Sequence, residues 1–145
     1  MRYCLIVVLM CLAVPPLWAT EFRTVDEDAV VLYDAPSLKA QKLYVLGRNY
    51  PVEVVVVLEN WIKVRDASGD LAWVEKQSLS DKRSVMVNVP LADIRQAPND
   101  NAPVVFQAEQ SVLLEFVESS DPGWIKVRHR DGQTGYIRTN QVWGV

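Results

Sequence analysis

The pentapeptide WIKVR occurs twice, at Trp61–Arg65 and at Trp124–Arg128. Self-similarity at a fixed spacing identifies a repeat architecture, and the similarity continues on both sides of the pentapeptide. The aligned segments are WIKVRDASGDLAWV (61–74) with WIKVRHRDGQTGYI (124–137), YDAPS (33–37) with RQAPN (95–99), and EVVVVLE (53–59) with VLLEFVE (112–118). We therefore predict a tandem duplication, with one copy at residues 20–82 and the other at residues 83–145.

Each copy is predicted to consist of short β-strands separated by turns. In the first copy the segments are AVVLY, KLYVL, VEVVVVL, WIKVR and LAWV. β-Branched and aromatic residues fill them, while Asp34-Ala-Pro and Asp131-Gly supply turn residues. Five strands in about sixty residues bury most apolar surface by curling into a small, partly open barrel. The predicted fold class is all-β, with two tandem small barrels in which WIKVR is the fourth strand.

The pleat of a strand divides WIKVR between two faces. Ile62 and Val64 fall on one face, which we assign to the core, and Trp61 falls on the outer face with Lys63 and Arg65. An aromatic residue at a barrel lip serves equally well as a structural cap or as a ligand contact. The sequence leaves both roles open for the repeated tryptophan.

Residues 1–19 are typical of an export signal. They contain one positive charge at Arg2, an apolar run from Leu5 to Val14 and a small residue at Ala19. The run is too short for a membrane span. We expect cleavage of this segment, a periplasmic or secreted protein, and no stable membrane span in the mature form. Cleavage would also remove Cys4 and Cys11, leaving no thiol.

The composition of the mature chain argues against several classes of function. Removing Arg2 leaves 15 − 1 = 14 basic against 18 acidic residues, a charge of −4, which argues against nucleic acid as a partner. Nucleophile triads and most zinc sites need histidine or cysteine, and only His129 remains, which we expect to be a solvated hairpin residue. The acidic run Asp26–Asp28 is expected to precede the first strand as a solvated entry. We predict no enzymatic activity, no catalytic residue, no metal and no cofactor.

Three features bear on how the two barrels are related. The linker Ser80–Ser84 contains neither glycine nor proline, so we expect a fairly fixed arrangement of the barrels. The run Val54–Leu58 is apolar on both pleat faces, and we expect its outer face to pack against the other barrel. Trp143 is expected to fold back onto the second barrel.

The repeated pattern W.KVR, followed by a glycine turn and GY or a relative, resembles bacterial SH3 domains. The most specific stretch is GQTGYIRTNQVWGV at 132–145. The resemblance covers nearly the whole mature chain and implies two SH3-like barrels, as in exported bacterial proteins made of a tandem pair. Such domains often accompany cell-wall hydrolases. Because this chain ends three residues after Val142, we expect the binding module alone.

Eukaryotic SH3 domains bind proline-rich ligands on an aromatic shelf, and this chain resembles them only in part. Tyr33 and Trp61 match shelf positions in the first copy, and Trp124 matches in the second. Different residues occupy the other shelf positions of the second copy, namely Arg95, Arg138 and Gln141. The incomplete shelf argues against recognition of a polyproline helix.

The leading hypothesis is an exported, non-enzymatic protein that binds a peptide or peptidoglycan-type ligand through aromatic clefts. The cations near each tryptophan would suit an acidic group such as a stem-peptide carboxylate. The candidate ligand-binding residues are Trp61, Trp124, Tyr33, Trp73, Tyr136, Lys63, Arg65, Lys126, Arg128 and Arg138.

Two further points were left open by the sequence. Tyr33, Tyr44 and Tyr50 are interpreted as lacking aromatic counterparts in the second copy, so the first copy is the better candidate for peptide binding. Trp73 and Tyr136 are interpreted mainly as half-exposed packing residues. The alternative function is an adaptor that pairs with an envelope protein through an exposed strand edge, with purely structural tryptophans.

Overall fold

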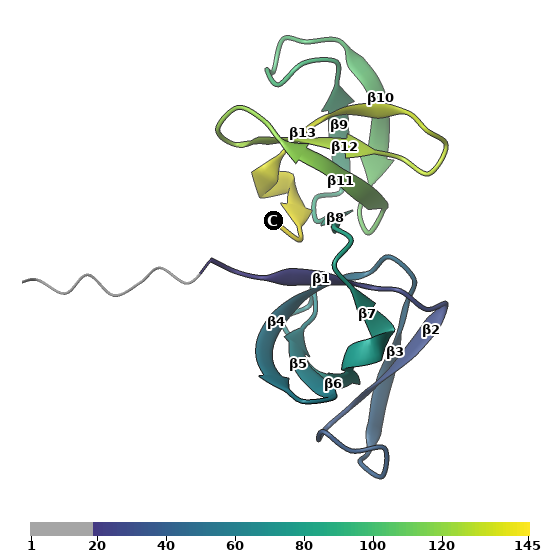
Figure 1. The fold of residues 1–145 in the computed structure, drawn as a ribbon. Coiled ribbons are helices and arrows are strands. Elements are labelled where there is room, and N and C mark those ends of the chain that lie inside the picture. Colours follow the sequence, from purple (N-terminus) through teal and green to yellow (C-terminus); the bar gives the residue numbers. More distant parts are fainter. Residues whose placement is uncertain (1–18) are drawn as a thin grey trace, which may run out of the picture.

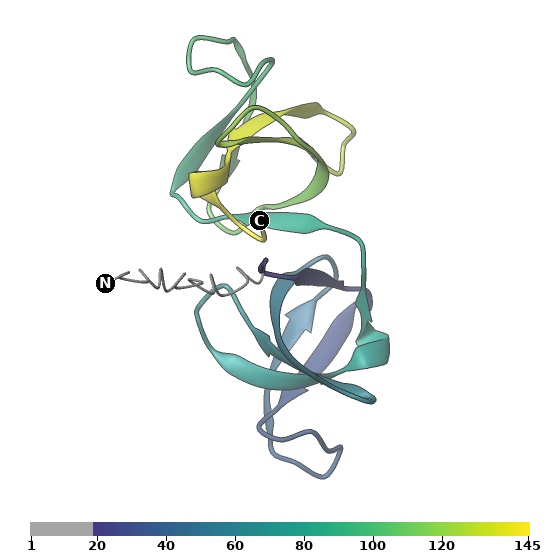
Figure 2. The same ribbon diagram turned by 60° about the vertical axis from the view of Figure 1, so that its left-hand side comes forward.

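The computed structural model describes residues 19–145, so the predicted export signal with its two cysteines lies outside the described residues. Two antiparallel sheets of seven strands follow one another along the chain, and residues 19–145 contain no α-helix. Each sheet curls into a small barrel, and the two barrels are stacked one above the other (Figures 1 and 2). The prediction of an all-β fold is confirmed.

The first sheet has the strand order β3-β2-β6-β5-β4-β1-β7. A single 3₁₀ turn, η1 (Lys76–Ser78), precedes its last strand. The strands are β1 (Phe22–Val25), β2 (Ala29–Tyr33), β3 (Lys42–Gly47), β4 (Pro51–Leu58), β5 (Trp61–Arg65), β6 (Leu71–Glu75) and β7 (Leu79–Ser80).

The second sheet repeats this topology in the order β10-β9-β13-β12-β11-β8-β14. It too has a 3₁₀ turn, η2 (Thr139–Gln141), before the last strand. The strands are β8 (Ser84–Val87), β9 (Leu91–Arg95), β10 (Val104–Glu109), β11 (Leu113–Ser119), β12 (Trp124–Arg128), β13 (Thr134–Arg138) and β14 (Val142–Trp143).

The prediction of five strands per barrel was too low. In the first copy it missed β1, whose short FRTV segment mixes charged and apolar residues, and the two-residue strand β7. WIKVR is therefore the fifth strand of each barrel. The acidic run Asp26–Asp28 connects β1 to β2 and does not precede the first strand, and it holds Arg48, whose Nε lies 2.8 Å from Asp28 Oδ1.

The cores are built from one face of each sheet, as the pleat predicts. Ile62 and Val64 of β5 and Val127 of β12 are fully buried, and Ile125 is 3% exposed. Burying one such aliphatic side chain contributes roughly 1.5–3 kcal/mol, so the alternate positions of WIKVR stabilise each barrel strongly. The opposite positions of the pentapeptide are left on the outer surface.

The expectation that Val54–Leu58 packs against the second barrel is wrong. β1 pairs only with the first half of β4, ending at Glu53, with one further bond from Val54 N–H to Glu21 O at 2.8 Å. The register then shifts between Val54 and Val56, as at a β-bulge. Beyond that point the apolar side chains of residues 55–58 are 39–48% exposed.

The barrels instead meet near the start of β4 and at the C-terminus. The strand β14 pairs with β8 of the second barrel, but the Trp143 side chain reaches the first barrel. Its ring packs edge to face on Phe22 at 5.1 Å, and its Nε1–H donates to Pro51 O at 3.1 Å. The expectation that Trp143 folds back onto the second barrel holds for its backbone, which pairs with β8, and is wrong for its ring, which contacts Phe22 of the first barrel.

The residues at the barrel junction are joined by further hydrogen bonds. The Ser84 hydroxyl donates to Asn49 O at 2.6 Å, and the Thr24 hydroxyl donates to Lys82 O at 2.6 Å. Gly144 has a φ of +115°, and a Cβ there would lie 2.7 Å from Ser84 O. Both its conformation and this close approach require glycine.

Candidate functional site

The outer face of the first barrel gathers aromatic side chains from three neighbouring strands. Tyr33 of β2 lies directly opposite Trp73 of β6, which in turn lies opposite Lys63 of β5. The ring of Trp61 meets Tyr33 edge to face, with centroids 5.5 Å apart and an interplanar angle of 87°. We call Tyr33, Trp61, Lys63 and Trp73 the first aromatic cluster.

Within this cluster the tryptophans remain partly accessible. Tyr33 is 7% exposed, whereas Trp61 and Trp73 are half-buried. An edge-to-face pair contributes about 0.5–1.5 kcal/mol beyond the area that it buries, so the Tyr33–Trp61 contact orients the tryptophan without covering it. The cluster presents a fixed aromatic surface to solvent.

Lys63 supplies a cation to this surface. Among residues 19–145 no carboxylate lies within ion-pair distance of its Nζ. Arg65, the other predicted cation, pairs with Glu53 at 3.1 Å and lies at the opposite end of β5, about 13 Å from Trp61 by strand rise. The structure therefore keeps Lys63 in the first aromatic cluster and separates Arg65 from it.

The loop after Tyr33 is rigidly closed beside the cluster. Asp34 N–H donates to Gln41 O at 3.1 Å, and Gln41 N–H donates back to Asp34 Oδ1 at 3.0 Å. Leu38 at the turn of this loop is 62% exposed. At the position of Leu38, the loop of the first barrel thus carries an apolar side chain and no charge.

The equivalent surface of the second barrel is covered. The guanidinium carbon of Arg138 lies 4.7 Å from the centroid of the Trp124 ring, and Trp124 is 7% exposed. Arg138 Nε donates to Asp100 Oδ1 at 2.9 Å, and its Nη2 contacts Asp100 Oδ2. We call Arg138 and Asp100 the arginine lid.

The remaining residues of the second surface also differ from the first cluster. Arg95 stands in place of Tyr33 and donates to Ala102 O at 2.8 Å and to Asp93 Oδ2 at 3.2 Å. Tyr136 lies between Arg95 and Lys126, whose Nζ is 6.0 Å from the Tyr136 ring centroid. This surface is therefore a network of cations stacked on aromatic rings.

Each residue of the arginine lid stabilises the charged form of the other. The hydrogen bond from Arg138 holds the pKa of the Asp100 carboxyl below its usual value, and the same contact raises the pKa of Arg138. Both groups are solvent-accessible, so the pair fixes the position of the guanidinium more than it stabilises the fold. The ring of Trp124 consequently has a stably placed cover.

Two other expectations about side chains are corrected. Arg128 does not lie beside Trp124. It is at the far end of β12, paired with Glu115 at 3.2 Å and facing a cavity between the barrels. His129 is not simply solvated, because its ring lies 5.7 Å from Phe106 and its Nδ1 lies 3.0 Å from Asp131 Oδ1.

The interpretation that Tyr44 lacks an aromatic counterpart is also wrong. β3 and β10 share the same burial pattern, and Phe106 occupies the position in β10 that Tyr44 occupies in β3. Burial raises the pKa of the Tyr44 and Tyr50 hydroxyls, and the Tyr50 hydroxyl accepts from Ala67 N–H at 3.1 Å. These two tyrosines belong to the packing of the first barrel.

Sequence reasoning missed Asp100, the second half of the arginine lid. The loops Asp34–Gln41 and Gln96–Pro103 share three backbone hydrogen bonds in the same register, so Asp100 corresponds to Leu38. Arg138 corresponds to Glu75 in the same way. Each change lies one residue beyond a segment that the repeats align. The sequence signal for this ion pair was that both changes occur together. The second copy has an aspartate and an arginine where the first copy has Leu38 and Glu75, which cannot form an ion pair.

Within the part of the chain that the structure describes, no helix is long and apolar enough to cross a membrane. The same residues contain no group of three or more His, Cys, Asp or Glu side chains placed to hold a metal ion.

Comparison with known proteins gives one family. The family described as bacterial SH3 domain matches twice, at residues 26–81 and 88–144. No curated protein matches the chain.

Similar solved structures include NlpC1 from Trichomonas vaginalis (17% identity, TM-score 0.41, covering 97% of this chain and 51% of that one). NlpC2 from Trichomonas vaginalis has 17% identity and a TM-score of 0.40, covering 88% of this chain and 49% of that one. An NlpC/P60 family protein from Bacillus cereus ATCC 10987 has 16% identity and a TM-score of 0.39, covering 85% and 56%. This chain thus spans about half the length of these proteins.

Proposed function

Because the chain belongs to the bacterial SH3 domain family, we propose that it is an exported, non-enzymatic binding protein whose first barrel recognises a cell-wall peptide of the peptidoglycan type. The proposed binding surface is the first aromatic cluster. The observation that carries this proposal is the edge-to-face contact of Tyr33 with a half-buried Trp61, next to Lys63, a cation without an ion pair among residues 19–145.

The chemistry of the cluster fits a peptide that ends in or carries a carboxylate. Tryptophan and tyrosine offer large, rigid contact area at low entropic cost, which suits short peptide and sugar-linked chains. Lys63 would donate a charge-assisted hydrogen bond to a carboxylate of the ligand. Among the described residues this ammonium group has no ion pair that a ligand would have to break, so the cost of binding at Lys63 is its partial desolvation.

The second barrel is assigned a different part in the proposal. A ligand that reached Trp124 would first have to displace Arg138, which is held by Asp100. We therefore propose that Trp61, Tyr33, Trp73 and Lys63 bind the ligand, while Trp124, Tyr136, Lys126 and Arg138 form a stable packed surface. Arg65 and Arg128 each pair with a glutamate of the adjacent strand and are removed from the ligand site.

The test is sedimentation of the purified exported protein with insoluble peptidoglycan. Lys63→Gln and Trp61→Ala should each reduce the bound fraction strongly. Lys126→Gln is the matched control, because it removes the same charge at the equivalent position of the other barrel. Equal binding by Lys63→Gln and wild type, or a larger loss with Lys126→Gln, would reject the assignment of the site to the first barrel.

A second candidate function has its own observation. Val55, Val56, Val57 and Leu58 are exposed side by side on β4, beyond the point where β1 stops pairing. An exposed apolar strand edge is a template for pairing with a strand of another chain. An envelope protein could add a strand there, which is the adaptor function.

The two functions are separated by site-specific crosslinking in intact cells. A photoreactive residue at Val57 should capture an envelope protein if the adaptor function holds, and Val56→Lys should abolish that capture. A photoreactive residue at Leu38, in the exposed loop beside the first aromatic cluster, should instead capture peptidoglycan fragments if the first proposal holds. Crosslinks at Val57 alone would favour the adaptor.

A further inference from the structure

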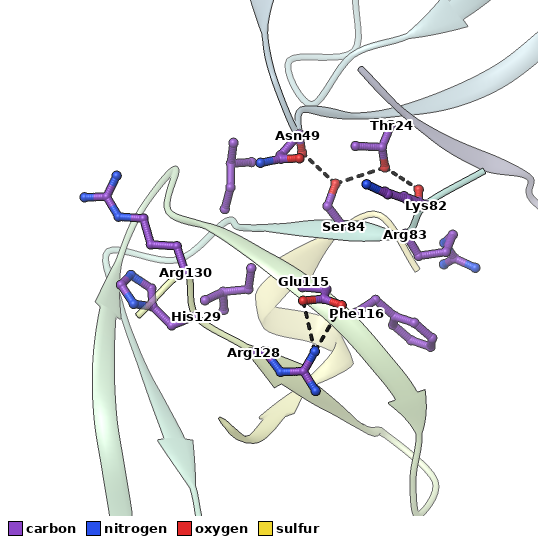
Figure 3. A pocket seen from close by; sticks show the side chains of 12 residues that line it. Thr24, Asn49, Lys82, Arg83, Ser84, Glu115, Phe116, Arg128, His129 and Arg130 are labelled. Carbon is purple, nitrogen blue, oxygen red and sulfur yellow. Dashed lines mark hydrogen bonds and ion pairs between the residues drawn. The ribbon is translucent and has the colours of Figure 1, made fainter. Parts of the chain in front are cut away.

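A cavity of about 450 Å³ lies between the two barrels, away from both aromatic surfaces. The segments Lys82–Ser84, Leu113–Phe116 and Arg128–Arg130 line it, with Thr24 and Asn49 on the side of the first barrel. Its volume is within the range of roughly 300–1,000 Å³ that small-molecule sites occupy. Figure 3 shows Asn49, Ser84, Thr24 and Lys82 joined by hydrogen bonds on one side and the Glu115–Arg128 pair on the other.

Positive charge is concentrated around this cavity. Its lining contains four basic residues, namely Lys82, Arg83, Arg128 and Arg130, and one acidic residue, Glu115, so its formal charge is 4 − 1 = +3 with His129 neutral. The whole chain carries −3. An acidic protein that gathers cations around one concave surface attracts anions to that surface.

Several of these cations retain hydrogen-bonding capacity. Arg128 uses Nη1 on both carboxylate oxygens of Glu115, at 3.2 Å each, which leaves its Nε and Nη2 without a bond among the described residues. Arg83 is held in place by a bond from Nη2 to Gly144 O at 2.8 Å and by the Phe116 ring, 4.9 Å away. Its Nε–H is buried and has no acceptor among residues 19–145.

The rest of the cavity lining includes two more cations, Lys82 and Arg130, and apolar side chains. Lys82 and Arg130 have no ion-pair partner in the part of the chain that the structure describes. Leu113, Leu114 and Phe116 contribute apolar lining on β11. Apolar lining with a few convergent polar groups is the usual composition of a small-molecule site.

We propose that the inter-barrel cavity binds a small molecule that carries an anionic oxygen group, carboxylate or phosphate, on a compact apolar body. The anionic group would accept from the free Nε and Nη2 of Arg128, with Lys82 and Arg130 adding positive charge on either side of the cavity (Figure 3), and the apolar body would lie against Phe116 and Leu113. A bound ligand would touch both barrels, because Asn49 and Thr24 belong to the first and β11 to the second. The site shares no residue with the first aromatic cluster and is independent of its function.

The test is an NMR titration of the ¹⁵N-labelled exported protein with benzoate, phenyl phosphate and benzamide. Benzamide is the neutral isostere of benzoate. At least one of the two anions should shift the amides of Ser84, Leu113 and Phe116 saturably, while benzamide binds at least about tenfold more weakly, because a hydrogen bond to a charged group is lost. The anion that binds more tightly identifies the preferred headgroup.

Two double variants make the assignment falsifiable. Lys82→Gln with Arg130→Gln should weaken the anion at least about tenfold. Lys39→Gln with Lys42→Gln removes the same charge from the first barrel away from the cavity and should leave the affinity unchanged. Equal affinity for benzoate and benzamide, equal losses in both double variants, or shifts centred outside the cavity lining would each overturn the proposal. Trp61→Ala should leave this binding intact even if it abolishes binding to the cell wall.

Discussion

Arg138 lies over the indole ring of Trp124 at 4.7 Å and is held there by Asp100, whereas the equivalent tryptophan of the first barrel, Trp61, packs edge to face with Tyr33. The same pentapeptide thus sits in two different environments. The substitutions responsible are outside the pentapeptide, at the positions of Leu38 and Glu75 in the first copy. The two identical strands therefore differ in surface because the residues that surround them differ.

Removal of the arginine lid should expose Trp124. In Arg138→Ala the ring loses its cover, and the ¹⁹F resonance of 5-fluorotryptophan at this position should be broadened by a soluble paramagnetic agent, as we expect for the half-buried Trp61 in the wild type. The fold should persist, because the core face of β12 is unchanged. Arg130→Ala, which removes an exposed arginine elsewhere, is the control. An unchanged Trp124 signal in Arg138→Ala would show that other residues cover the ring.

The lid should also open in acid. The pKa of Asp100 is lowered in the folded protein by its bond with Arg138, so the contribution of the pair is fully present above the unfolded value of about 3.9 and is lost as the pH falls through the lower folded pKa. Access of the paramagnetic agent to Trp124 should therefore rise only below about pH 4. In Asp100→Asn access should be high at pH 7 and flat across this range. A wild-type transition near neutrality would contradict the assignment to Asp100.

The two tryptophans should differ in their effect on stability. Trp124 is 7% exposed, so Trp124→Ala should lower the free energy of unfolding by about 3–5 kcal/mol. Trp61 is half-buried, and Trp61→Ala should lower it by roughly 1–2 kcal/mol. The measurement is urea unfolding, followed separately in each barrel by fluorotryptophan signals. Equal losses would mean that the tryptophans do the same structural job.

The relation of the barrels should depend on the C-terminal tryptophan. Trp143→Ala removes the ring contact with Phe22 and the hydrogen bond to Pro51 O. ¹⁵N relaxation should then report shorter rotational correlation times for both barrels, with little change in their internal amide shifts. Trp73→Ala, which truncates an indole on the outer sheet face, should leave the correlation times unchanged. Two barrels that tumble separately in the wild type would contradict the interface described above.

The sequence was sufficient for the fold because the repeat and the strand pleat are local signals. Ile62 and Val64 were assigned to the core from alternation alone and are fully buried. The short strands β1 and β7 were missed because two to four residues of mixed polarity carry no periodicity. Val54–Leu58 was misassigned because a run apolar on both faces does not reveal a bulge or where its neighbour strand ends.

The candidate site was predictable only in the first barrel. Tyr33, Trp61, Lys63 and Trp73 come together because strand pairing brings β2, β6 and β5 side by side, which follows from the fold. The covering of Trp124 depends on a contact between Asp100 and Arg138, 38 residues apart. Contacts of that kind between side chains on a loop and a strand end are not encoded in periodicity.

The central claim is that the first aromatic cluster is open to a ligand and the corresponding surface of the second barrel is closed. The most direct measurement is a ¹⁵N amide titration with a soluble peptidoglycan fragment that carries its stem peptide. Shifts should be centred on Tyr33, Lys63 and Trp73, and the amides of Arg95, Lys126 and Tyr136 should stay in place. Shifts centred on the second barrel, or no saturable shift in either, would contradict the claim.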